Sequence, residues 1–322
     1  MRVPLPAAIT TTSTNAMNLI PSSDQIISQR GWVGRRLGWC LALGLTACLS
    51  SCSLVVTGYN NAPQALMFTW IDPHLDLTAA QSRQTKADLT QVLAWHRQQQ
   101  LPLYADWLVR MQQLAPQQVQ AEQVCRLADE IRDSLKPLAA QMETPLATLA
   151  LSLQAPQLDT MKTRFDKDNS TWRQDWKLDG SSQDRLEVQT EKGQKNAERF
   201  YGKVSKAQQA QLRLLAQSSG FDAERTYAER LRQQADMLQT LQTIGTAQRN
   251  LTSSRQTVRD WLQRSLNTPD EDYAAYLKKR QALNCQAAAQ FHNSTTAEQR
   301  ANAVKVFKSY EADVRELMRT NP

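Results

Sequence analysis

The chain has 322 residues, a formal net charge of +7 and 41% hydrophobic residues, a composition that is typical of a folded protein and excludes a disordered one. Only 10 residues are glycine, and six of these follow residue 51, which disfavours the glycine-rich phosphate loops of nucleotide enzymes. Glutamine occurs 37 times, and Gln, Ala, Leu and Arg all favour helices. The composition therefore predicts an all-α protein.

Residues 1–51 have the pattern of a bacterial signal peptide. Arginines precede an apolar run, Leu37–Leu49, which is long enough for a secretory signal but too short to span a membrane. The run is followed by Cys52, at the end of a Leu-Ser-Ser-Cys sequence that resembles the lipobox of lipidated proteins. Cys48 ends a similar sequence and is the alternative lipidation site. An uncleaved signal anchor is a further interpretation, and the chain starts at Met1 or Met17.

A lipidated Cys52 would fix the mature protein to a membrane without spanning it, because two or more acyl chains such as palmitate give a stable anchor. Ser53, rather than Asp, at the next position resembles the outer-membrane sorting signal of enteric bacteria. We therefore expect a lipoprotein on the periplasmic face of the outer membrane, with the membrane as a partner through its lipid. After cleavage, 34 basic and 30 acidic residues leave a charge of +4. Export makes nucleic acid an implausible partner.

The cysteines of the mature chain predict one disulfide. Cys40 and Cys48 leave with the signal and Cys52 is lipidated, so Cys125 and Cys285 remain. An even pair in an oxidising compartment is typical of a bridge. The alternative is two buried free thiols on separate helices.

We expect a tether and an apolar entry segment over residues 52–77, then one helical domain over residues 78–322. A polar stretch near 166–185 predicts a loop or hinge within that domain. The first expected helix covers 78–100, and the chain restarts as helix at Pro102. Further helical stretches begin at Pro116, Pro145 and Pro156, and the next helices cover 183–202 and a segment that begins at Ser205. A long helix with an apolar stripe follows over 227–244, and the last helices cover 252–266, 269–291 and the residues from Thr296 onward.

A Ser/Thr-x-x-Gln sequence opens a helix three times, at Thr78, Ser205 and Thr296. This spacing is the capping box, in which the first side chain and the Gln side chain each bond to the other residue's backbone N–H. We interpret all three as helix caps. A family motif is the alternative interpretation.

Several short sequences resemble the domain-of-unknown-function 6279 family, a group of proteobacterial lipoproteins without an established activity. The matching stretches are the lipobox, 59–63, 70–72, 76–77 with Gln81, 95–97, 101–102, 200–202, and Cys285 with 292–296 and 299–300. The resemblance covers nearly all of the mature chain and implies a helical, lipid-anchored periplasmic protein. Residues 77–81, Leu-Thr-Ala-Ala-Gln, are also similar to the LTxxQ motif of periplasmic chaperones such as spheroplast protein Y.

The three histidines give no metal-binding spacing, and no Cys-x-x-Cys is present, so we expect neither a metal nor a cofactor. His96 and His292 are candidates for a polar cluster that could also include Asp72, although ordinary structural histidines are the alternative. Asp72, His74 and Asp76 lie close together in the sequence and are expected in an exposed turn, with a polar site as the alternative. No nucleophile elbow or phosphate loop is present, so we find no catalytic residue.

These observations predict a non-enzymatic binding or structural role in the cell envelope, with envelope proteins as candidate partners. Two alternatives remain. One is a chaperone-like protein that binds unfolded clients, and the other is an envelope hydrolase, because glycosidase carboxylates need no local motif.

Overall fold

The computed structural model describes residues 58–59, 61–66, 70–246 and 250–319, and every regular element within these ranges is a helix. The predicted all-α class is therefore confirmed. The helices are α3 (Ala62–Leu66), α4 (Asp72–Leu75), α5 (Ala79–Gln99), α6 (Leu101–Leu114), α7 (Ala121–Asp133), α8 (Leu135–Ser152), α9 (Ala155–Asp175), α10 (Ser182–Tyr201), α11 (Lys206–Ser218), α12 (Ala223–Thr246), α13 (Leu251–Leu266), α14 (Glu271–Asn293) and α15 (Ala297–Arg319). Cys48 and Cys52 lie outside the described residues.

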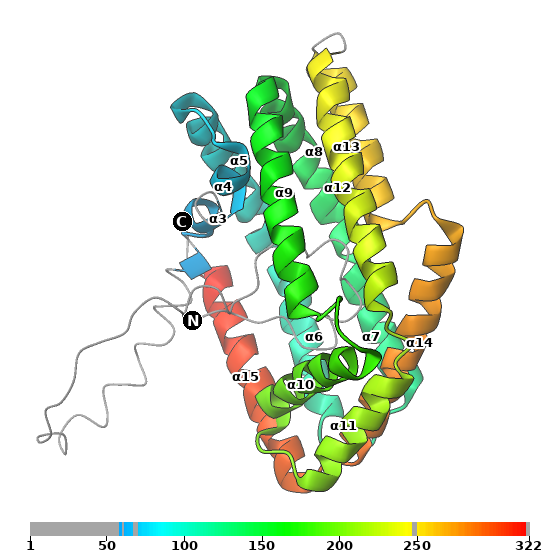
Figure 1. Ribbon diagram of the computed structural model, residues 1–322. Coiled ribbons are helices and arrows are strands. Elements are labelled where there is room, and N and C mark those ends of the chain that lie inside the picture. The colour runs from blue at the N-terminus through cyan, green and yellow to red at the C-terminus, as the bar shows by residue number, and fades with distance from the viewer. Residues whose placement is uncertain (1–57, 60, 67–69, 247–249, 320–322) are drawn as a thin grey trace, which may run out of the picture.

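Helices that run along one another fill one end of the molecule, and α10 and α11 lie at the other end (Figure 1). Figure 1 shows α8, α9, α12 and α13 running along one another, with α10 and α11 crossing beneath them. α15 packs along α6, α13 along α8, and α14 along α7. None of the described helices combines the length and apolar character that crossing a membrane requires.

The largest apolar cluster lies between α8, α9, α12 and α13. Ala147 is fully buried on α8, and its small side chain lets α13 approach with Val258 and Trp261. Burying a side chain such as Val258 contributes about 1.5–3 kcal/mol, so this contact between distant segments is a main source of stability.

The entry segment is part of the folded body. Tyr59 packs against the apolar cluster of α6 and α15, and Trp70 packs against the cluster that includes α8 and α9. The apolar entry segment expected within residues 52–77 thus contributes side chains to these two clusters. The described part of that segment contains two short helices, α3 and α4, which lie against α5 and α9.

The predicted polar loop near 166–185 is mostly helix, because α9 continues to Asp175 and α10 begins at Ser182. One of the polar residues that suggested a loop, Asn169, finds its partners on α12. Asn169 is buried, donates to Gln234 Oε1 (2.7 Å) and accepts from Arg230 Nε (2.7 Å).

Two proline predictions were also wrong. Pro145 lies inside α8 instead of beginning a helix, and Pro116 lies in the connection between α6 and α7. A proline inside a helix removes one backbone donor at a cost of about 3 kcal/mol, and α8 nevertheless continues through Pro145 to Ser152. Thr78 caps α5 as predicted, because its Oγ1 accepts from Gln81 N (3.3 Å) and its N–H donates to Gln81 Oε1 (2.9 Å).

Candidate functional site

A cavity of about 830 Å³ lies where the α10–α11 and α14–α15 connections meet, at the lower end of the molecule in Figure 1. We call it the α11–α15 pocket. It is lined by Tyr201, Gly202, Lys203, Val204, Ser205, Ala207, Gln208, Gln211, Ser294, Thr296, Glu298, Gln299, Ala301, Asn302 and Lys305.

One wall of the pocket forms where α10 stops and α11 starts. Gly202 ends α10 with φ 71° and ψ −150°, a conformation that only glycine adopts readily. Ser205 then caps α11, with its N–H donating to Gln208 Oε1 (2.9 Å) and its Oγ accepting from Gln208 N (3.2 Å). The predicted capping box is confirmed.

The opposite wall is the start of α15. Thr296 N–H donates to Gln299 Oε1 (3.0 Å), and Gln299 N–H donates to Thr296 Oγ1 (3.2 Å), so the third predicted box is also a helix cap. The two helix starts meet at the pocket, and each presents its capping-box glutamine toward the other.

These two glutamines bond to one another. Gln208 Nε2 donates to Gln299 Oε1 (2.8 Å), and Gln299 Nε2 donates to Gln208 Oε1 (3.0 Å). Gln299 Nε2 also contacts the carbonyl of Lys203 (2.9 Å). The Gln208–Gln299 pair thus joins chain segments 91 residues apart. Sequence reasoning found both caps and missed the pairing, because nothing local indicates which helix start meets which.

A buried histidine supports the pocket from behind Tyr201. His292 Nε2 lies 2.8 Å from the carbonyl oxygen of Gln117, which can only accept, so Nε2 donates. In the neutral ring Nδ1 is then an acceptor, and it receives the hydrogen of Tyr201 OH (2.9 Å). Burial lowers the pKa of His292 and raises the pKa of Tyr201 to about 12. Both groups are therefore neutral near pH 7, and their contacts fix the position of the residues behind the pocket.

Two further side chains tie the end of α14 to the α6–α7 connection. Asn293 accepts from Val119 N–H (2.9 Å) and donates to Val119 O (2.9 Å). Arg300 on α15 donates to Pro116 O in that connection (3.4 Å) and to Asn293 O at the end of α14 (3.1 Å). The wall of the pocket is consequently anchored on both sides, and its charged lining residues are Lys203, Lys305 and Glu298.

The predicted polar cluster of His96, His292 and Asp72 is not formed. His96 contacts Tyr59 OH through Nδ1 (2.8 Å) and Tyr104 OH through Nε2 (3.3 Å). Asp72 accepts from the backbone N–H of Leu77 (3.2 Å). Within the described ranges, the hydrogen bonds, ion pairs and ring contacts of the three residues join none of them to another. No local sequence motif indicates which of these three side chains meet in the folded protein.

His74 is buried, so its assignment to an exposed turn was wrong. Its Nε2 lies 2.9 Å from Asp168 Oδ2, and its ring stacks on Trp70 at 4.6 Å between centroids. The partner Asp168 is on α9, and a contact over 94 residues gives no signal in the local sequence.

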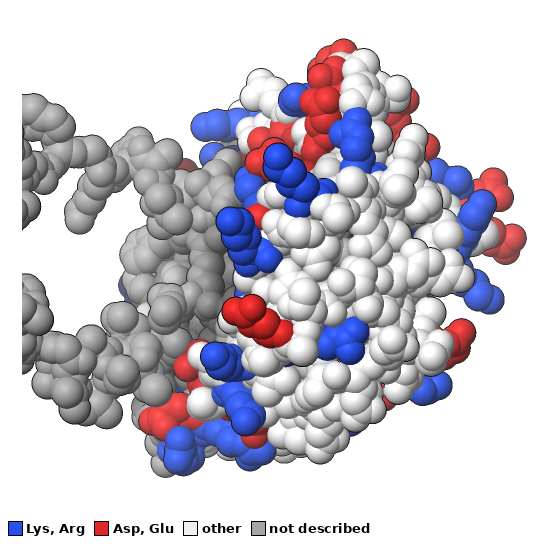
Figure 2. Space-filling view, turned by 90° about the horizontal axis from the view of Figure 1, so that it is seen from below, with Lys and Arg blue, Asp and Glu red and all other residues white. Residues whose placement is uncertain are grey.

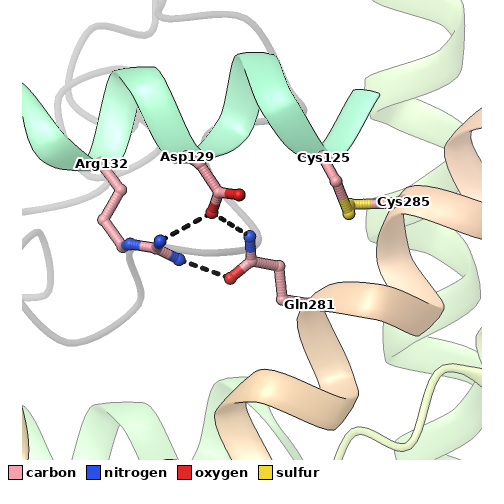
Figure 3. Close-up of a disulfide and its surroundings, with 5 residues drawn as sticks. All are labelled: Cys125, Asp129, Arg132, Gln281 and Cys285. Atoms are coloured by element: carbon pink, nitrogen blue, oxygen red, sulfur yellow. Dashed lines mark hydrogen bonds and ion pairs between the residues drawn. A yellow bond between two sulfur atoms is a disulfide. The ribbon is translucent and has the colours of Figure 1, made fainter. Parts of the chain in front are cut away.

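Cys125 on α7 and Cys285 on α14 form a disulfide, with the sulfurs 2.07 Å apart, which confirms the predicted pairing. Figure 3 shows a polar group beside it that joins the same two helices. Gln281 donates to Asp129 Oδ1 (2.6 Å), and Arg132 donates to both Asp129 (2.6 Å) and Gln281 (2.5 Å). Within the described ranges, no group of three or more His, Cys, Asp or Glu side chains is placed to hold a metal ion.

Comparison with known proteins gives one match. The model of a family of unknown function, DUF6279, matches residues 73–274, from α4 to the first turn of α14. No curated protein and no solved structure matches the chain. Because the matched stretch is more than half of the chain, the protein belongs to the DUF6279 family of unknown function.

Proposed function

We propose that this protein is a lipid-anchored protein of the cell envelope with a non-enzymatic binding role, and that it binds through the α11–α15 pocket. The observation that carries the proposal is the pocket itself, whose lining is rich in amide and hydroxyl groups and is held in place by the Gln208–Gln299 pair. The imidazole nearest to it, His292, is neutral and already donates to a carbonyl, so it supports the wall instead of exchanging protons.

The envelope location rests on the cysteines. The lipobox places Cys52 directly after an apolar signal sequence, and Ser53 is compatible with sorting to the periplasmic face of the outer membrane. The Cys125–Cys285 disulfide fits an oxidising compartment such as the periplasm. The resemblance to proteobacterial lipoproteins supports the same assignment.

Replacing the lipidated cysteine tests the location. We expect Cys52→Ala to abolish acylation and to release the protein from the membrane fraction, whereas the matched variant Cys48→Ala stays acylated and membrane-bound. Mass spectrometry of the mature N-terminus measures both. Acylated, membrane-bound Cys52→Ala protein would refute Cys52 as the lipidation site, and loss of acylation only in Cys48→Ala would assign the lipid to Cys48.

Site-specific crosslinking tests the binding role. A photoreactive residue at Ala207, which lines the pocket, should capture an envelope component, and Ala80 is a matched control. Both alanines are exposed on the first turn of a helix that follows a Ser/Thr cap, Ala207 on α11 and Ala80 on α5. Equal capture at both positions would contradict a role of the pocket. A different result would show an enzymatic role instead of a binding role. In that case the purified protein would turn over an envelope substrate, and one polar substitution in the pocket would abolish the turnover.

A chaperone-like role is the second candidate, because the lower end of the molecule has a broad surface with few charged residues (Figure 2). Leu214 on α11 is 65% exposed, more than the other exposed large hydrophobic side chains of the described residues. We expect Leu214→Gln to weaken suppression of client aggregation, while Leu103→Gln, at 44% exposure on α6, does not. Failure of the unmodified protein to suppress aggregation at a one-to-one ratio would exclude this role. No feature of the pocket favours the hydrolase alternative, since Glu298 is its one lining carboxylate among the described residues.

A further inference from the structure

A second glutamine pair, far from the pocket, repeats the arrangement of the first. Gln81 Nε2 donates to Gln157 Oε1 (3.1 Å), and Gln157 Nε2 donates to Gln81 Oε1 (3.0 Å). Gln157 also contacts the carbonyl of Asp76 (3.1 Å), as Gln299 contacts that of Lys203. The Gln81–Gln157 pair joins the starts of α5 and α9, and the Gln208–Gln299 pair joins the starts of α11 and α15.

The helix order between the paired glutamines is the same in both cases. Three helices separate α5 from α9, and three separate α11 from α15. Each first helix also follows a residue with positive φ at the end of the preceding helix, Asp76 (φ 49°) after α4 and Gly202 (φ 71°) after α10. By helix order, α4–α9 and α10–α15 are therefore two comparable series of six helices.

A ring contact occupies the same place in each series. His74, two residues before Asp76, lies 5.9 Å from Phe165, and Phe200, two residues before Gly202, lies 5.5 Å from Phe307. Phe165 and Phe307 each stand eight residues after the paired glutamine of their helix. The residue three positions further on is the second partner in both series: Asp168 bonds to His74, and Tyr310 contacts Phe200.

The two series also pack on each other in a reciprocal way. α7 of the first packs on α14 of the second, and α8 of the first packs on α13 of the second. In this comparison α13 corresponds to α7, and α14 corresponds to α8. Such a reciprocal arrangement is the isologous contact that two subunits make around a twofold axis.

The covalent and ionic links between the series lie at corresponding positions. Cys125 is five residues after Gln120, the N-cap of α7, and Arg255 is five residues after Asn250, the N-cap of α13. Their partners correspond as well, when counted back from the cap of the next helix. Cys285 on α14 precedes Thr296, the cap of α15, by eleven residues. Glu143 on α8 precedes Gln154, the N-cap of α9, by eleven residues. Arg255 lies 3.7 Å from Glu143, so an ion pair stands where the other side has the disulfide.

We propose that residues 72–319 are an internal duplication, in which α4–α9 and α10–α15 are two copies of one six-helix unit that pair as the subunits of a homodimer do. The interaction surface of each unit is then complementary to a second copy of itself. The proposal is independent of the function proposed for the pocket.

The two units differ in charge at a corresponding position. Where the pocket has Ala301, two residues after Gln299, the first unit has Asp159, two residues after Gln157. The glutamine pairs are common to both units, so the duplicated scaffold is retained while the surface of the pocket has diverged.

Moving the disulfide tests the correspondence. We expect Glu143→Cys with Arg255→Cys to form a second bridge in the oxidised full-length chain, detected by peptide mapping without reductant. A matched control is Thr144→Cys with Arg255→Cys, because Thr144 is exposed and points to a different side of α8. The control pair should stay reduced.

The same bridge should substitute for the native one. In a chain that also has Cys125→Ser and Cys285→Ser, the 143–255 bridge should restore roughly nine tenths of the urea midpoint lost with the native disulfide, because the closed loops are of similar length. Free thiols at 143 and 255 in folded protein, as in the control pair, would overturn the correspondence, and so would a bridge that restores none of the lost midpoint.

Discussion

His96 is the group that we expect to make this fold sensitive to acid. Its side chain is enclosed between Tyr59 of the entry segment and Tyr104 of α6, and burial lowers its pKa from 6.5 to about 4. Between these values the unfolded chain binds the proton more tightly than the folded one. Stability is therefore fully present above about pH 6.5 and is lost as the pH falls toward 4. The shift corresponds to about 3 kcal/mol at its full extent.

Urea unfolding at pH 7.5 and pH 4.5 measures this loss. Other groups titrate in the same interval, so the informative quantity is the difference between the wild type and His96→Gln. We expect the variant to lose about 2–3 kcal/mol less on acidification than the wild type. Tyr59→Phe is the control, because it keeps the aromatic ring and removes only the hydroxyl, which contacts His96 Nδ1 and Leu93 O, and it should retain the acid sensitivity. Equal losses in the wild type and His96→Gln would refute the reasoning.

Three further predictions concern the pocket and the disulfide. Gln208→Ala and Gln299→Ala should each lower the free energy of unfolding by about 1–3 kcal/mol, because each removes the hydrogen bonds between the two amides and one half of a capping box, and the double variant should cost less than the sum in a urea double-mutant cycle. Replacing Cys125 and Cys285 by Ser opens a loop of 160 residues and should cost up to about 5 kcal/mol, whereas reductant should have no further effect on that variant in the same assay. Gly202→Ala should lower stability by about 1–3 kcal/mol through backbone strain at φ 71°, and a melt that matches the wild type would contradict this.

The helical fold was predictable because its signals are local. A capping box lies within four residues, and the boxes at Thr78, Ser205 and Thr296 each open the helix that was expected there. The disulfide followed from counting, since only two cysteines remain beyond the lipobox. The errors occurred where tertiary contacts decide local structure. Asn169 is typical of a loop by composition, yet its amide is buried in α9 by bonds to α12.

The candidate site was beyond sequence reasoning for a related reason. Its histidine, His292, was singled out, but as a member of a cluster with His96 instead of as the partner of Tyr201. The pocket depends on which helix start meets which, and the contact between Gln208 and Gln299 spans 91 residues. No spacing in one sequence specifies such a contact. The residues that shape the site could therefore be recognised as caps, and their joint role could not.

The internal duplication accounts for the four capping boxes whose glutamines meet in pairs, whereas the boxes at the starts of α7 and α10 lie outside these pairs. Two units with two meeting helix starts each require four, and the sequence shows three of the Ser/Thr-x-x-Gln type. The fourth stands at the start of α9, where Gln154 N–H donates to Gln157 Oε1 (3.0 Å). Gln154 replaces the hydroxyl residue of the motif, so a search for Ser or Thr misses it, while the glutamine that forms the pair is kept. The repeated element is thus the paired glutamine, and the cap is the local structure that positions this glutamine side chain next to its partner.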